Sequence, residues 1–106
     1  RNMPARHRSM RVVFESSWER LTPEEQRVLA GLSIFRPGFG RDAARAVADA
    51  TPALLLALVD KSLLHHREDG RYEMHELLRQ FAQEKLEALP EDNLRVRHAH
   101  CAYLRA

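Results

Sequence analysis

The chain has 106 residues, of which 44% are hydrophobic and 30% charged, so it is one small globular domain and not a disordered chain. Its formal net charge of +2, with acids and bases interspersed, excludes a strong general attraction for polyanions. The single cysteine, Cys101, excludes an internal disulfide, and the longest apolar run, Ala53 to Val59, is too short to span a membrane. We therefore expect a cytoplasmic protein. Because residues 1–4 (RNMP) lack a starting methionine, we also expect the chain to be a fragment of a longer one.

The first third of the chain predicts a linker and two helices. Residues 1–8 are basic and contain a proline, which favours a linker from an upstream subdomain. Apolar spacing then predicts a helix from about Ser9 to Arg20, and its inward stripe comprises Met10, Val13, Phe14, Ser17, Trp18 and Leu21. A second helix begins at Pro23, because Thr22 can cap it and Glu25 can complete a capping box.

The middle of the chain predicts a short strand, a turn and two more helices. Residues 33–35 (SIF) are apolar and too few for a helix, which favours a strand, and residues 36–40 (RPGFG) predict a turn. A third helix is expected over Arg41–Ala48. The fourth, Pro52–Lys61, begins with the same threonine–proline signal as the second and is strongly apolar.

The rest of the chain predicts a β-hairpin and two further helices. Residues 63–67 and 71–74 flank a turn that contains Asp69-Gly70, a strong hairpin signal because glycine tolerates positive φ. Helices are expected from about Glu76 to Ala88 and within residues 91–106. This order of elements is that of a winged helix-turn-helix domain. We expect a mainly α fold with a small β-hairpin, in which residues 9–89 form the winged helix and residues 91–106 lead into a downstream domain.

Many winged helices bind DNA through the helix that is fourth here. That helix has a single cation, Lys61, beside Asp60, and no arginine, asparagine or glutamine that could contact a base edge. The hairpin tip carries Glu68 and Asp69, which phosphates would repel. A DNA-binding domain of a transcriptional regulator is therefore the alternative function, and these residues argue against it.

The sequence predicts no self-sufficient catalytic or metal site. His65 and His66 are neighbours on a strand and point to opposite faces, so they cannot share a metal ion. His98 and His100 are two apart on a helix and do not face each other. Cys101 is expected to be a small packing residue and not a nucleophile.

An unusual pair, His75 and Glu76, stands where the hairpin ends and a helix begins. The residues alone favour a helix cap with an acid that suits the helix dipole. A phosphate sensor is the other interpretation, because a helix N-terminus favours anions and histidine adds a ring N–H donor. An acid–base pair is disfavoured, since adjacent residues at a helix start point in different directions. Farther along this helix, Arg79 and Lys85 are expected to be exposed, whereas Phe81, like Phe14 and Trp18, is expected in the core.

The same junction, residues 72–82 (YEMHELLRQFA), resembles the methionine-histidine-aspartate motif of NB-ARC proteins. These belong to the STAND class of signal-transduction ATPases with numerous domains. Met74, His75 and Glu76 occupy the motif positions, with glutamate in place of the family's aspartate. Other segments resemble the winged helix of bacterial members: residues 4–11, 17–18, 21–25, 32–35 and 58–64. Together the resemblance covers nearly the whole chain, and it makes the sensor the preferred interpretation of His75.

The resemblance implies a regulatory module and not an enzyme. In that family the winged helix packs over bound ADP in the resting state, the motif histidine reaches the β-phosphate, and nucleotide exchange rearranges the module for signalling or assembly. His75 is the matching residue. The family's phosphate loop and magnesium-binding acids lie upstream, so ADP or ATP with magnesium is implied only for the full-length protein.

The implied partners are the upstream nucleotide-binding and helical subdomains, a downstream helical-repeat domain, and a second copy in self-association. The implied class is that of bacterial transcriptional regulators with helical repeats. A structural spacer without a signalling role is a third interpretation of the same chain.

Overall fold

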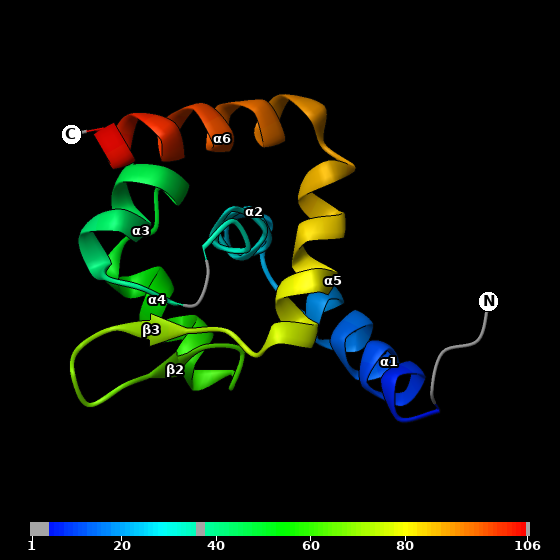
Figure 1. The fold of residues 1–106 in the computed structure, drawn as a ribbon. Coiled ribbons are helices and arrows are strands. Elements are labelled where there is room, and N and C mark those ends of the chain that lie inside the picture. Colours follow the sequence, from blue (N-terminus) through cyan, green and yellow to red (C-terminus); the bar gives the residue numbers. More distant parts are fainter. Residues whose placement is uncertain (1–4, 36–37, 106) are drawn as a thin grey trace.

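A computed structural model describes residues 5–35 and 38–105 (Figure 1). The elements in chain order are α1 (Ala5–Glu19), α2 (Pro23–Leu32), β1 (Gly38–Phe39), α3 (Arg41–Ala48), α4 (Pro52–Asp60), β2 (His65–His66), β3 (Tyr72–Glu73), α5 (Glu76–Glu87) and α6 (Pro90–Arg105). The fold is mainly α with a small antiparallel sheet, which confirms the predicted class. Strands β2 and β3 form a hairpin directly after α4, and we call this hairpin the wing.

Helix α2 lies at the centre of the fold and contacts α3, α4, α5 and α6 (Figure 1). Its predicted capping box is present: the Glu25 N–H donates to Thr22 Oγ1 over 3.1 Å, and the Thr22 N–H donates to Glu25 Oε1 over 3.0 Å. A Cβ on Gly31 would lie 3.0 Å from the Cβ of Ala48 and 3.5 Å from Cγ2 of Val96. The missing side chain of Gly31 therefore lets α2 approach α3 and α6 closely.

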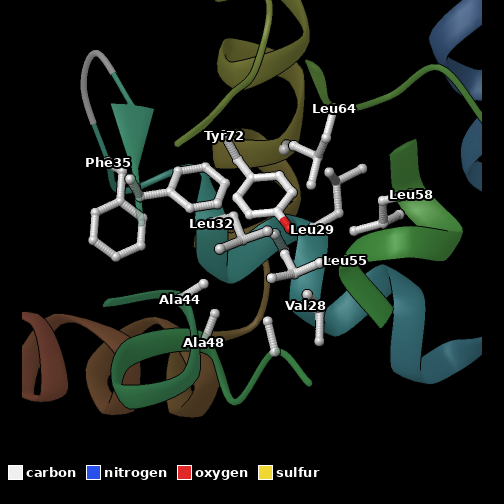
Figure 2. Close-up of a cluster of buried hydrophobic side chains, with 14 of the residues drawn as sticks. Val28, Leu29, Leu32, Phe35, Ala44, Ala48, Leu55, Leu58, Leu64 and Tyr72 are labelled. Carbon is white, nitrogen blue, oxygen red and sulfur yellow. The ribbon is translucent and has the colours of Figure 1, made fainter. Parts of the chain in front are cut away.

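The hydrophobic core surrounds α2 and takes side chains from most of the other elements (Figure 2). The labelled members are Val28, Leu29, Leu32, Phe35, Ala44, Ala48, Leu55, Leu58, Leu64 and Tyr72. The ring of Tyr72 projects from the wing toward Leu29 and Leu32 of α2, which attaches the wing to the helices. Each large side chain buried in this way contributes about 1.5–3 kcal/mol.

The sheet has the strand order β1-β3-β2, with both pairings antiparallel. Gly70 has φ +88°, as expected for the predicted hairpin turn between β2 and β3. Phe39 of β1 and His66 of β2 both pair with Tyr72 of β3. The hairpin prediction is confirmed.

The predicted first strand was placed wrongly. Residues 33–34 form a turn at the end of α2, where the Ser33 hydroxyl donates to the Ala30 carbonyl over 2.6 Å. The strand is Gly38–Phe39, which the sequence assigned to a turn, while residues 36 and 37 of that turn lie outside the described ranges. A Cβ on Gly38 would lie 2.8 Å from the Tyr72 carbonyl oxygen, so the glycine that suggested a turn is what allows β1 to approach β3.

Helix α1 packs against α5 and begins earlier than predicted. Residues 5–8, expected in a linker, are helical, and residues 1–4 of that linker lie outside the described ranges. The rings of Phe14 and Trp18 lie 5.9 and 6.0 Å from that of Phe81, which confirms their expected packing. Val13 is 60% exposed and not inward, because it lies about 100° around the helix from Phe14.

Helix α6 crosses α3 and α2, and its Val96 is 1% exposed. The helix predicted within residues 91–106 is present and begins at Pro90. Cys101 is exposed, so the prediction that it packs is wrong. It follows Val96 by five residues, which places it about 140° around the helix from the buried face.

Candidate functional site at the start of helix α5

His75 is the N-cap of α5, with φ −54° and ψ 139°. Its Nδ1 accepts a hydrogen bond from the Leu77 backbone N–H over 3.1 Å, and the side chain is exposed. The structure therefore contains the helix cap that the residues alone favoured. Because Nδ1 acts as the acceptor, the proton of the neutral ring resides on Nε2. The cap thus selects the tautomer that presents an Nε2–H donor.

A cleft of about 700 Å³ lies beside His75, between α1, the end of α4, the wing and the start of α5. Its apolar walls come from Met10, Phe14, Val59, Leu63, Leu64, Met74 and Leu78, and its polar residues are Ser62, His65, His66, Glu73 and His75. Met74, which precedes His75, is half-buried and packs against the core, so it holds the connection between the wing and α5. His75 therefore borders a mainly apolar cleft while its own ring meets solvent.

Glu76 pairs with a buried cation. Its carboxylate accepts hydrogen bonds from Arg79 Nε and Nη2, each over 2.9 Å. Arg79 is only 6% exposed, so the prediction of an exposed residue is wrong. Its Nη1 also donates to the Ser33 carbonyl over 3.1 Å and to Gln83 Oε1 over 2.9 Å. The hydrogen bond with Glu76 raises the pKa of Arg79 above its ordinary value.

The spacing of the buried residues of α5 could have located Arg79. Ala82 and Leu86 are both buried, and they follow Arg79 by three and seven residues. These intervals define one face of a helix. The sequence reasoning treated the charge as a sign of exposure and overlooked this position in the stripe.

Lys85 is half-buried, not exposed as predicted. Its Nζ lies 5.0 Å from the ring centre of Phe81 and 5.7 Å from that of Trp18, and 3.5 Å from Glu15 of α1. The cation therefore lies in the contact between α1 and α5, where aromatic faces attract it.

Two other histidines, His66 and His100, contact aromatic rings. His66 stacks on Tyr72 at 4.4 Å between ring centres, and His100 meets Phe35 edge-on at 5.3 Å. Within residues 5–35 and 38–105 there is no group of three or more His, Cys, Asp or Glu side chains arranged to hold a metal ion. In the same residues no helix is both long and apolar enough to cross a membrane.

Helix α4 exposes an apolar side chain on the face that would meet DNA, and two cations beside that face are paired. Leu56 of α4 is 61% exposed. Lys61 Nζ lies 2.7 Å from Glu25 Oε1, and in the wing Arg67 lies 2.9 Å from Asp69. Contact with phosphates would require these cations to leave their acidic partners.

The fold matches part of a STAND protein. The match is the crystal structure of a Signal Transduction ATPase with Numerous Domains (STAND) protein with a tetratricopeptide repeat sensor from Pyrococcus horikoshii, with a TM-score of 0.62 and 24% sequence identity. The match covers 91% of this chain and 14% of that protein's chain. No protein-family model matches the chain, and no curated protein matches it. The likeness shows that the chain has the fold of a small piece of a multidomain ATPase.

Proposed function

We propose that the chain is the regulatory module of a STAND-type ATPase, which closes over bound ADP in the resting state and rearranges on nucleotide exchange. The fold likeness to a STAND protein supports the protein class. One observation carries the assignment of the site: His75 caps α5 through Nδ1, which leaves the Nε2–H of an exposed ring available to a ligand.

The surroundings of His75 suit a phosphate. The N-terminus of a 12-residue helix carries a partial positive charge that attracts anions. Glu76 would oppose a phosphate, but its charge is balanced by the double hydrogen bond with Arg79. A hydrogen bond to a charged group contributes about 1.5–3 kcal/mol. If it forms only in the closed state, the same free energy favours that state over the open one.

The other components of the switch belong to other parts of the longer protein. We assign the phosphate loop and the magnesium ligands to upstream subdomains, so that this chain supplies one contact to ADP and no catalytic group. A helical-repeat domain would follow α6, and nucleotide exchange would free surfaces of the module for self-association.

The test uses the longer protein with a His75→Ser substitution. Serine keeps an oxygen that can cap α5, but it is too short to replace the Nε2–H. We expect ADP to dissociate roughly 10- to 100-fold faster, the factor for the loss of a charge-assisted hydrogen bond. His98→Ser, at an exposed histidine on α6, is the matched control and should retain ADP as the wild type does. Equal ADP retention in the two variants would overturn the proposed role.

A further inference from the structure

We propose that Glu76 and Arg79 are positioning residues for His75. With the Ser33 carbonyl they form a latch that joins the first turn of α5 to the end of α2. The inference rests on the proposed function only in taking His75 as the nucleotide contact. In this inference Glu76 acts within the chain, where it binds Arg79 and so helps to position His75.

The contacts of Arg79 define the latch. Four hydrogen bonds leave this guanidinium: two to Glu76, one to the Ser33 carbonyl and one to Gln83. Ser33 is fully buried at the C-terminal end of α2, and Glu76 is the first residue of α5. The guanidinium thus holds the start of one helix against the end of another, directly beside the cap that orients His75.

The double hydrogen bond with Arg79 explains why residue 76 is a glutamate. A planar guanidinium binds a carboxylate best through two parallel hydrogen bonds. Here the carboxylate reaches across one helical turn to both Nε and Nη2 of Arg79. Aspartate is one methylene shorter and would lose at least one of the two bonds at this spacing.

Because Arg79 is buried, its charge is stable there only while the Glu76 carboxylate is present. Arg79 is 94% removed from solvent, and a buried charge without its partner is strongly unfavourable. Without the Glu76 carboxylate, Arg79 would turn toward water and release the Ser33 carbonyl. The first turn of α5 would then loosen, and with it the hydrogen bond between His75 Nδ1 and the Leu77 N–H.

The latch also connects the site with the rest of the module. Helix α2 contacts α3, α4, α5 and α6. A displacement of His75 would therefore be transmitted through Arg79 to the central helix α2.

Nitrogen-15 NMR of this chain without nucleotide tests the latch. We expect wild-type His75 to show one tautomer, with the proton on Nε2, and a protected Leu77 amide. In Glu76→Gln and in Glu76→Asp the tautomer signals should average, and the Leu77 amide should exchange about fivefold faster, the factor for the loss of a typical cap. Glu25→Gln is the control, because it also removes a carboxylate that binds a cation, here Lys61, without removing a hydrogen-bond partner of Arg79 or His75.

The comparison is made at conditions where all variants are equally folded. If the Glu76 variants then match Glu25→Gln in both signals, the pair is merely structural and the inference is wrong. If Glu76→Gln does not fold, the milder Glu76→Asp carries the test with the same two readouts. Because no nucleotide is present, a failure of His75→Ser to release ADP would remove the proposed function and leave the latch standing.

Discussion

Lys61 Nζ lies 2.7 Å from Glu25 Oε1, so the C-terminal end of α4 is joined to the first turn of α2 by an ion pair. The same carboxylate oxygen accepts the Thr22 N–H in the capping box. Glu25 is 7% exposed, which makes it the acid most protected from solvent among the described residues.

This pair predicts a pH dependence of stability. The hydrogen bond from Lys61, followed by that from the Thr22 backbone, lowers the pKa of Glu25 in the folded state. The stabilisation is therefore fully present above the unfolded pKa and is lost as the pH falls through the lower folded pKa. Urea unfolding should show Glu25→Gln to be about 1–2 kcal/mol less stable than wild type at neutral pH. The difference should shrink as the pH falls through the lowered pKa of folded Glu25, because its carboxylate then becomes protonated in wild type. A constant difference across this range would contradict the assigned pair.

The cap of α5 predicts how substitutions at position 75 affect stability. His75→Ala removes the Nδ1 acceptor and should lower the free energy of unfolding by about 1 kcal/mol. His75→Ser should recover most of this loss, because serine is a good N-cap. Denaturant titration of the chain measures both. Equal stability of the two variants would mean that the hydrogen bond to Leu77 contributes nothing.

The contact around Gly31 predicts an intolerance of larger side chains. Gly31→Val adds carbons where even a Cβ would lie 3.0 Å from Ala48, and overpacking of this kind costs about 1–3 kcal/mol. Gly40→Ser is the control, because nothing lies within 4 Å of the added Cβ, its φ is −93°, and serine is a good N-cap for α3. Thermal unfolding should show a clear loss for the first variant and little change for the second. A neutral Gly31→Val would show that α3 and α6 can move away from α2 without cost.

The apolar face of α4 predicts weak DNA binding. Fluorescence anisotropy with a labelled duplex at about 0.15 M salt should show no saturation at micromolar protein. Lowering the salt should reveal only sequence-independent binding. Tight, sequence-dependent binding at physiological salt would favour the alternative function of a DNA-binding regulator.

The assignment of catalysis to other subdomains predicts that the purified chain does not hydrolyse ATP. Phosphate release with magnesium and ATP should equal that of buffer alone. Turnover that co-purifies with the chain and is altered by His75→Ser would show that the module itself is catalytic.

Local signals were enough to predict most of the helices and the hairpin. Threonine followed by proline marks the start of both α2 and α4, and the sequence predicts the bounds of α3 correctly. Asp69-Gly70 marks the wing turn. These features depend on backbone geometry and hydrogen bonds within a few residues, so they can be recognised without knowledge of the fold. The position of His75 at the start of α5 was predicted in the same way, while its role toward ADP stays a prediction.

Only the tertiary structure decided which residues meet across elements. Gly38 lies in a strand and not a turn because the Tyr72 carbonyl approaches it from β3. Arg79 keeps its charge in a buried position because the Ser33 carbonyl, at the end of α2, accepts one of its hydrogen bonds beside those to Glu76 in its own helix. Cys101 is exposed because α6 packs through its opposite face. In these cases contacts between elements decided the outcome: the Tyr72 carbonyl for Gly38, the Ser33 carbonyl for Arg79, and the packing of α6 against α2 and α3 for Cys101.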